Sequence, residues 1–166
     1  MSRQLGEDKD IEARKNNIIL YRVPEHAFGT PAENSNRDIS FFKAFCQEGI
    51  KIEMTDHDVA KTYRLGKKET DKTRPLLIKL KDMEKKLQVM KNLKKLKNAH
   101  ECYKSISVAH DLTPLQRQHV KILLEQAKEQ EASTSDGPSE NERWIVVGQN
   151  GKPRMKKIKV RTGIDA

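Results

Sequence analysis

The order in which strand-like and helix-like segments follow one another constrains the fold of this sequence most strongly. Segments rich in β-branched and large apolar residues, bounded by Pro, Gly or polar loops, predict β-strands. Apolar residues recurring every three or four positions predict amphipathic helices. These patterns predict a strand, a helix, two strands, a second helix and a fourth strand. The strands are expected within residues 17–23, 59–68, 74–80 and 105–112, and the helices within residues 36–49 and 82–98.

The two predicted helices have recognisable ends. Asn36 is expected to cap the first helix and Gly49 to end it, and Asp82 is expected to cap the second. Each helix has one apolar face, which should pack on the sheet. These faces are predicted to consist of Ile39, Phe42, Phe45 and Cys46 in the first helix and of Met83, Leu87, Met90 and Leu93 in the second.

This order is that of a split βαβ arrangement, an α+β fold with two helices on one face of a four-stranded antiparallel sheet. The other face of the sheet stays open. Alternation along the first strand places Ile18 and Leu20 on one side and Asn17, Ile19 and Tyr21 on the other. In the RNA-recognition motif (RRM), which has this arrangement, aromatic residues on the open face stack on the bases of single-stranded RNA.

The predicted third strand lacks the aromatic residues of a standard RRM. The usual pattern, K/R-G-F/Y-G/A-F-V-x-F/Y, would place aromatics where Pro75 and Leu77 stand, and only Tyr21 is available on the first strand. Tyr21 has an alternative role as an ordinary strand residue covered by the C-terminal segment. We therefore expect weak base stacking and mainly electrostatic binding of phosphates. The cations expected to bind phosphates from this side are Arg22, Arg64, Arg74 and Lys79.

A third helix is predicted beyond the fourth strand. Thr113 and Gln116 form a capping box, with Pro114 at the first helical position. The helix should extend to about residue 132, with an apolar side and a basic side. The apolar side is predicted to be Leu115, His119, Ile122, Leu123 and Ala127, and the basic side Arg117, Lys121 and Lys128.

The C-terminal stretch "WIVVGQNGKPRMKKIKV" predicts a β-hairpin with the Asn-Gly pair at 150–151 as its turn. A two-residue turn would pair Val146 with Met155 and Trp144 with Lys157, and Trp144 is expected to anchor the hairpin on the preceding helix. The predicted organisation is a polar N-terminal segment (1–13), a nonstandard RRM-like domain (14–112), the helix (113–132), a flexible loop (133–142), the basic hairpin (143–161) and a tail (162–166).

Charge points to an acidic partner. The chain has 166 residues, 33 Lys and Arg against 24 Asp and Glu, and a net charge of +9. Residues 143–161 contain seven basic and no acidic residues, and therefore carry +7 of this charge. Such an imbalance favours a negatively charged polymer or surface, and charge alone does not choose between nucleic acid and membrane. A nuclear-localisation role for the "KKIK" stretch is the alternative explanation of these lysines.

Several function classes find no support in the sequence. No apolar run approaches the roughly 18 residues that span a bilayer, and no signal peptide precedes the first strand, so we expect an intracellular protein that does not enter a membrane. No catalytic or phosphate-loop motif is present, which predicts a non-enzyme. Cys46 is expected to be an inert core residue. His100, Cys102 and His110 lack the spacing of a zinc site, so no metal or cofactor is expected.

In this order, the segments "RKNNIILYRVPE", "YRLGKK", "RPLLIKL", "LKKLK" and "DLTPLQRQ" resemble the first open-reading-frame (ORF1) protein of non-LTR, LINE-type retrotransposons. The resemblance covers residues 14–161. It implies a nonstandard RRM domain and a small C-terminal domain that hold single-stranded RNA, or single-stranded DNA, between them. It also implies a non-catalytic nucleic-acid chaperone in a ribonucleoprotein particle, cytoplasmic foremost and nuclear as the alternative.

The resemblance also suggests individual residues. It makes Arg64, Lys67 and Lys68 candidate contacts to the nucleic-acid backbone, and the family usually has Gly where this chain has Arg22. Family members form trimers through an upstream coiled coil, for which the residues before "RKNN" are too few, so a monomer is expected. The predicted nucleic-acid-binding residues are Tyr21, Arg22, Arg64, Lys67, Lys68, Arg74, Lys79, Arg117, Lys121, Lys152, Arg154, Lys156, Lys157 and Lys159.

A protein-interaction module that uses the sheet face is the alternative function. Basic residues converging on one continuous surface would favour nucleic acid. An exposed apolar patch of Ile19, Tyr21 and Leu77 would favour a protein partner.

Overall fold

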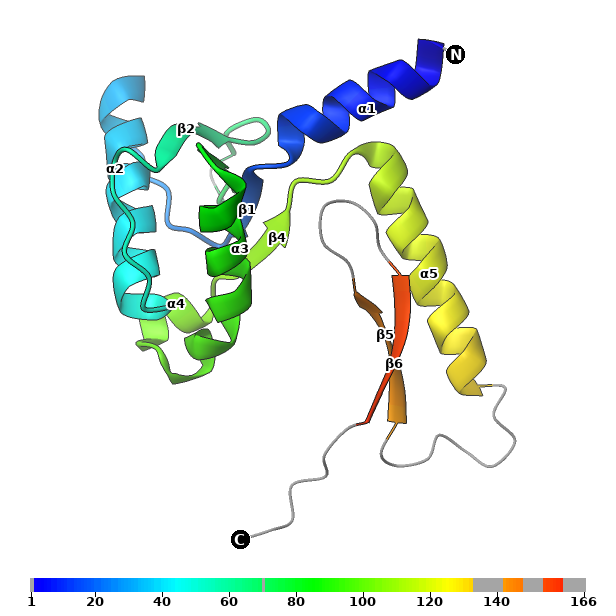
Figure 1. The fold of residues 1–166 in the computed structure, drawn as a ribbon. Helices are drawn as coiled ribbons and strands as arrows, with labels where there is room; N and C mark the ends of the chain where they lie inside the picture. The colour runs from blue at the N-terminus through cyan, green and yellow to red at the C-terminus, as the bar shows by residue number, and fades with distance from the viewer. Residues whose placement is uncertain (1, 70, 133–141, 148–153, 160–166) are drawn as a thin grey trace, which may run out of the picture. The chain divides into compact units, whose positions relative to one another are not determined.

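The computed structural model describes residues 2–69, 71–132, 142–147 and 154–159. These residues form two compact units (Figure 1). One unit is Ala13–Asp111, and the other combines the start of the chain, up to Glu12, with the part that begins at Leu112.

The first unit contains a four-stranded antiparallel sheet in the order β2-β3-β1-β4. Each strand coincides with a segment that the sequence predicts as a strand, so the predicted α+β class with this sheet is confirmed. The order of elements is compatible with an RRM-like fold. The strands are β1 (Asn17–Tyr21), β2 (Val59–Arg64), β3 (Leu76–Leu80) and β4 (Ser107–His110).

Helices pack on one face of this sheet (Figure 1). They are α2 (Pro31–Ala44), which continues as the π-helical turn η1 (Phe45–Gly49), and α3 (Met83–Asn92), which continues as the 3₁₀ helix η2 (Leu93–Asn98). A short helix, α4 (Glu101–Lys104), precedes β4. The core between helices and sheet includes the fully buried residues Ile18, Leu20, Phe42, Phe45, Cys46, Leu76, Ile78 and Val89.

The core location predicted for Cys46 is confirmed. Its side chain is fully buried, and burial raises the pKa of its thiol. A thiol held in its neutral form in apolar surroundings is a poor nucleophile.

The helix α2 begins earlier than the sequence analysis predicts. Its N-cap is Thr30, whose hydroxyl accepts a hydrogen bond from the Glu33 amide, while the Glu33 carboxylate accepts one from the Thr30 amide. Pro31 occupies the first turn. This capping box satisfies the amides at the helix start, so Asn36 lies inside the helix and the prediction of Asn36 as N-cap is wrong. The prediction of Asp82 as the cap of α3 is confirmed by its hydrogen bond with the Lys85 amide.

An irregularity in β2 changes which of its side chains share a face. Val59 pairs with Leu80, but Lys61 pairs with Lys79, so Ala60 is an extra residue on the β2 side. Such a β-bulge interrupts the strict alternation of side chains. Val59 consequently reaches the core, although Lys61 lies two positions further along the strand and is exposed.

The second unit contains the helix α5 (Pro114–Ala132) and the strands β5 (Glu142–Val147) and β6 (Arg154–Lys159). The helix α1 (Ser2–Arg14) covers the predicted polar N-terminal segment, and its Glu7 carboxylate accepts a hydrogen bond from the Thr113 hydroxyl. At the start of α5 the Thr113 amide donates to the Gln116 side chain at 3.0 Å, and the Gln116 amide donates to the Thr113 hydroxyl at 3.2 Å. The predicted capping box is confirmed.

The strands β5 and β6 pair antiparallel, and α5 packs mainly on β5. Val146 pairs with Met155 and Trp144 with Lys157, as a two-residue turn would require. The predicted turn at 150–151, residues 133–141 of the loop predicted at 133–142, the tail and the side chain of Trp144 lie outside what the structure describes. Glu142, predicted as the last loop residue, is the first residue of β5.

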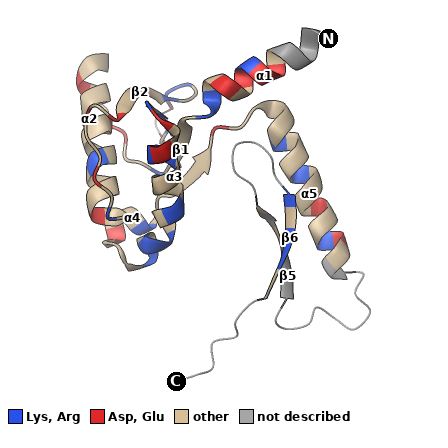
Figure 2. Cartoon of the chain, in the orientation of Figure 1, with Lys and Arg blue, Asp and Glu red and all other residues tan. Residues whose placement is uncertain are grey.

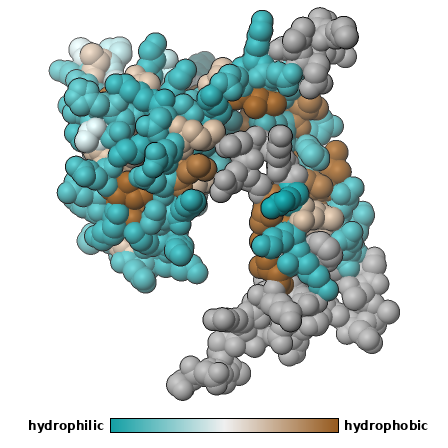
Figure 3. Space-filling view, in the orientation of Figure 1, coloured by the Kyte–Doolittle hydropathy of each residue, from teal (hydrophilic) through white to brown (hydrophobic). Residues whose placement is uncertain are grey.

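The predicted apolar side of α5 is only partly correct. Ala127 is buried as predicted, but Leu115 and Ile122 are exposed. The more buried side chains of this helix, Gln116, Val120, Leu123 and Ala127, form one stripe at helical spacing. Exposed hydrophobic residues therefore lie on this unit, whose described surface Figure 3 shows in brown and teal.

Candidate nucleic-acid interface

The open face of the sheet is built from three rows of cross-strand neighbours. The central row contains Tyr63, Leu77, Ile19 and Ala109, in the order of the strands. Next to it on one side lie Lys61, Lys79 and Asn17, and on the other side lie Tyr21 and Ser107. Since all these residues alternate with core residues, their side chains point away from the helices.

The middle of this face is apolar but offers little exposed apolar area. Ile19 and Leu77 are 6% and 9% exposed. In contrast, Tyr21 and Tyr63 are 39% and 48% exposed. The exposed apolar patch of Ile19, Tyr21 and Leu77, which would favour a protein partner, is therefore not formed as such: only the tyrosine contributes substantial exposed surface.

Tyr63 is a candidate that the sequence analysis misses. Read with strict alternation, Val59, Lys61 and Tyr63 would share one face, and the apolar Val59 gives no reason to place Tyr63 at the open surface. The bulge at Ala60 separates Val59 from the other two. The side chains of Thr62 and Arg64, which contact α2 through Ser35 and Asp38, leave Tyr63 on the opposite side.

Arg64 does not lie on the open face, so its predicted placement there is wrong. Its guanidinium faces α2 and forms a buried ion pair with Asp38, in which the two side chains are 8% and 10% exposed. The same guanidinium donates hydrogen bonds to the backbone carbonyls of Val23, Pro24 and Arg74 at 2.8–3.1 Å. Arg64 therefore ties β2 to α2 and to the segment after β1, and its donors are already used.

Arg74 is also engaged within the protein. Its guanidinium forms an ion pair with Glu25, with nitrogen–oxygen distances from 2.5 Å. The hydrogen bonds from Arg74 hold the pKa of Glu25 below its usual value, and the carboxylate in turn raises the pKa of Arg74. Neutralised by Glu25, Arg74 is a weaker candidate for a phosphate contact than the sequence analysis predicts.

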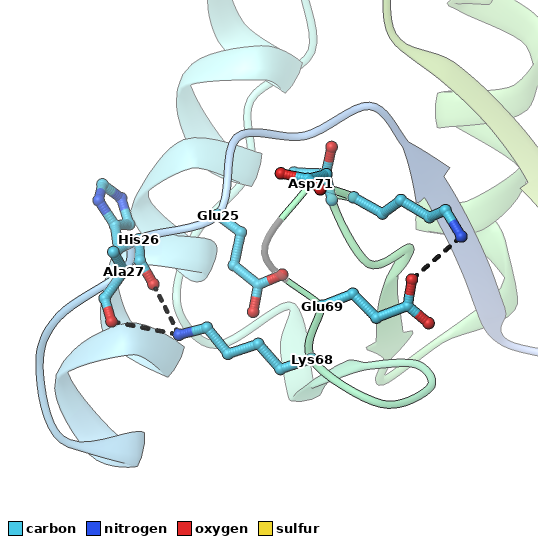
Figure 4. A pocket seen from close by; sticks show the side chains of 8 residues that line it. Glu25, His26, Ala27, Lys68, Glu69 and Asp71 are labelled. Atoms are coloured by element: carbon cyan, nitrogen blue, oxygen red, sulfur yellow. Dashed lines mark hydrogen bonds and ion pairs between the residues drawn. The ribbon is translucent and has the colours of Figure 1, made fainter.

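The loop that holds Lys67 and Lys68 contains acidic residues as well. A shallow hollow of about 500 Å³ lies beside it, lined by Glu25, His26, Ala27, Lys68, Glu69, Asp71, Lys72 and Thr73 (Figure 4). The Lys68 ammonium points to the carbonyls of His26 and Ala27 at 3.5 and 3.2 Å, and Lys72 pairs with Glu69. Lys67 is exposed. The lining contains three carboxylates and two lysines, so it offers a polyanion no net attraction.

Arg22 follows β1 with a φ of 63°, a left-handed backbone conformation that favours glycine. The Arg22 side chain is exposed, and its guanidinium donates a hydrogen bond of 3.3 Å to the Ser107 hydroxyl on β4. Its cation therefore remains accessible beside Tyr21.

The second unit carries further predicted cations, which Figure 2 shows in blue along α5 and β6. Arg117 and Lys121 are exposed on α5. On β6, Arg154, Lys156 and Lys157 are exposed. Lys152 and the side chain of Lys159 lie outside the described residues.

Within the described ranges, no group of three or more His, Cys, Asp or Glu side chains is arranged to hold a metal ion. His100 and Cys102 lie close together, with 3.2 Å between Nδ1 and Sγ, at the start of the short helix α4. The same part of the chain contains no helix with the length and apolar character needed to span a membrane.

Comparison with known proteins adds no family. The chain matches no protein-family model, and a search of curated proteins finds no significant match.

Proposed function

We propose that this chain is a non-catalytic protein that binds single-stranded nucleic acid, RNA foremost and single-stranded DNA as well, mainly through the phosphate backbone. In this proposal the first unit is an RRM-like domain and the second a C-terminal helix with a basic hairpin, as in ORF1 proteins of LINE-type retrotransposons. The protein would then serve as a nucleic-acid chaperone within a ribonucleoprotein particle. The sheet order β2-β3-β1-β4, which is compatible with an RRM-like fold, supports the proposal.

The observation that carries the proposal is the concentration of exposed cations on β6. Arg154, Lys156 and Lys157 are exposed within six residues, and no acidic residue occurs between positions 143 and 161. A strand that presents cations without intervening acids attracts a polyanion over its whole length. Backbone phosphates are the ligands that such a strand can bind repeatedly and without regard to base sequence.

The sheet face contributes a second group of cations. Lys61 and Lys79 are both exposed there, and neither forms an ion pair with a residue in the described ranges. In contrast, Arg64, Arg74 and Lys68 are held by intramolecular partners. The proposal therefore rests on the exposed cations Lys61, Lys79, Arg117, Lys121, Arg154 and Lys156.

The alternative, a protein-interaction module that uses the sheet face, has less support. Such a module would need a contiguous exposed apolar patch. Ile19 and Leu77 are nearly covered, and lysines lie beside them.

Neutralisation of charge on β6 tests the proposal. We expect the variant Arg154→Gln/Lys156→Gln to bind an unstructured 20-nucleotide RNA more weakly than the wild type in a fluorescence-anisotropy titration at low salt. The matched control is Lys94→Gln/Lys95→Gln, which removes the same charge from exposed positions of η2, on the helix-covered side of the sheet.

The two variants lower the net charge equally, so any difference between them reports the location of the site. A loss of affinity in the β6 variant together with near wild-type affinity in the η2 variant supports the proposal. Equal effects in the two variants would indicate only non-specific attraction. The absence of binding by the wild type would refute the proposed function.

A further inference from the structure

Two tyrosines of this sheet are exposed and, in the described parts of the chain, lack the packing and hydrogen bonds of a structural tyrosine. The sequence has three tyrosines. Tyr103 shows what a structural tyrosine looks like in this fold: it is 6% exposed, packs edge-on against Phe45, and donates a hydrogen bond of 2.9 Å from its hydroxyl to Glu48. Tyr21 and Tyr63 are 39% and 48% exposed, and within the described residues neither hydroxyl has a hydrogen-bond partner.

Both rings lie on the open face, beside the apolar residues of its central row. Tyr63 is the cross-strand neighbour of Leu77, and Leu77 is the neighbour of Ile19. Tyr21 follows two residues after Ile19 on the same side of β1. Ile19 and Leu77 are nearly covered, whereas part of Tyr21 and of Tyr63 remains accessible.

The cations on this face identify the kind of ligand. Lys61 and Lys79 are directly opposite each other on neighbouring strands, and both are exposed. Like charges in directly opposed positions destabilise a sheet unless an anion lies between them. Asp111 contacts Asn17 of this row, and its carboxylate already accepts hydrogen bonds of 2.9 Å from Arg14 and Asn17. The pair Lys61–Lys79 therefore has no acidic partner among the described residues.

We propose that Tyr63 and Tyr21 form a base-stacking platform for single-stranded nucleic acid, and that Lys61 and Lys79 bind a phosphate of the same strand. This inference rests on the proposed function and deepens it. It places one stacking residue on the edge strand β2, whereas the central strand β3 carries none. Exposed aromatic rings next to cations are the combination by which proteins bind single strands without sequence preference.

The separation of the rings sets how many bases they bind. Tyr21 and Tyr63 are two strands apart and offset by two residues, which corresponds to about 12 Å between their Cα atoms. Rings at this distance cannot stack on each other, since aromatic pairs lie about 4.5–7 Å apart. Each tyrosine therefore takes a different base, and the platform requires unpaired bases.

Comparing a normal strand with an abasic strand, which has phosphates but no bases, distinguishes the contribution of stacking to the affinity from that of phosphate binding. The probes are a single-stranded RNA 12-mer and a 12-mer of the same charge that lacks all bases, titrated against the full chain. We expect the wild type to prefer the RNA with bases. The variant Tyr63→Ala should bind this RNA about 5- to 150-fold more weakly, the range that corresponds to the loss of one stacked base. Its affinity for the abasic strand should not change.

Conservative variants show whether a loss of affinity comes from the missing ring or from a disturbed fold. Tyr63→Phe keeps the ring and should retain the preference for bases. Tyr63→Leu keeps an apolar side chain beside Leu77 but removes the ring, and should reduce the preference by the factor expected for one lost stacked base even if Tyr63→Ala is poorly folded. Thermal unfolding of each variant shows which of them are native.

The outcomes distinguish the platform from the proposed function. If the wild type binds both strands equally and Tyr63→Leu matches it, the platform is refuted while phosphate binding stands. If the wild type binds neither strand at low salt, both proposals fail. Unchanged RNA affinity of Tyr63→Leu together with a preference for bases would assign stacking to another residue and refute the role of Tyr63.

Discussion

Arginine residues of this chain show that a basic side chain in a basic protein can be structural. Arg64 donates to Asp38 and to three backbone carbonyls, and both members of the ion pair are almost inaccessible to solvent. The bidentate geometry of a guanidinium suits such a role, because one planar group can bridge several acceptors. Sequence spacing alone cannot distinguish this arginine from one that faces a ligand.

Replacement of Arg64 by Ala should therefore destabilise the fold. Removing one member of a buried ion pair leaves the other charge unpaired, and the expected loss in free energy of unfolding is about 3–5 kcal/mol. Urea denaturation followed by circular dichroism measures this loss. The control Lys67→Ala, at an exposed loop position, should change stability by less than about 0.5 kcal/mol. A stable Arg64→Ala variant would contradict the structural role of the ion pair.

Because of Lys86, the stability of the fold should depend on pH in the alkaline range. It is 3% exposed on α3 and donates a hydrogen bond of 2.5 Å to the carbonyl of Lys15. Burial lowers the pKa of Lys86 to about 8, although the nearby Asp111 acts to raise it. His110 also lies near Lys86, but its pKa is lowered from 6.5, so it titrates below this range.

Between about pH 8 and about pH 10.4, the unfolded chain retains a proton on Lys86 that the folded chain releases. The free energy of unfolding should therefore rise with pH in this window. The measurement is the difference between the wild type and Lys86→Met at pH 7.5 and at pH 10, in which the contributions of other lysines cancel. We expect this difference to shift in favour of the wild type at pH 10. Equal pH dependence of both proteins would disprove the lowered pKa.

At the scale of whole elements, the sequence predicts most of the first unit. The strands β1 and β3 consist mainly of large apolar residues, and β2 and β4 contain the β-branched or aromatic residues Val59, Thr62, Tyr63 and Val108. These local signals do not depend on distant contacts. The capping boxes are equally local. Thr30, Pro31 and Glu33 repeat the pattern of Thr113, Pro114 and Gln116, so the start of α2 could have been predicted by the same rule that identifies α5.

Features that depend on pairing between strands could not be predicted in this way. The bulge at Ala60 is defined by the register of β2 against β3, and it decides that Tyr63 faces outward while Val59 faces the core. The partners of Arg64 and Arg74 come from α2 and from the segment after β1. The candidate site therefore differs from the predicted one because long-range contacts, not composition, determine which cations stay available.

The opposed lysines of β2 and β3 allow a prediction in which stability and binding change in opposite directions. Lys61→Gln removes one of two like charges in directly opposite positions, so the free energy of unfolding should increase by about 0.2–1 kcal/mol. The same change should weaken RNA binding, because one phosphate contact is lost. Lys94→Gln, at an exposed position of η2 on the helix-covered side of the sheet, is the matched control for both measurements. A destabilised Lys61→Gln variant would mean that another anion already compensates the pair.

At the scale of the whole molecule, charge and stacking are separable contributions to binding. Residues 143–161 carry +7 of the net charge of +9, so the remaining 147 positions contribute only +2. Attraction to a polyanion should accordingly depend mostly on the C-terminal stretch. The aromatic rings, however, lie in the first unit, on β1 and β2.

This division predicts two regimes of salt dependence. If Lys61, Lys79, Arg154 and Lys156 each contact a phosphate of a single strand, the logarithm of the affinity should fall with the logarithm of salt concentration with a slope of about −3. Stacking releases no counterions, so the preference for RNA over an abasic strand should persist as salt rises. Anisotropy titrations of both strands from 50 to 400 mM KCl, about the range over which such contacts weaken, measure both quantities. A slope near zero would exclude phosphate binding as the main contribution to the affinity. If the preference for bases disappears together with the affinity as salt rises, the rings bind bases only after the phosphates have positioned the strand.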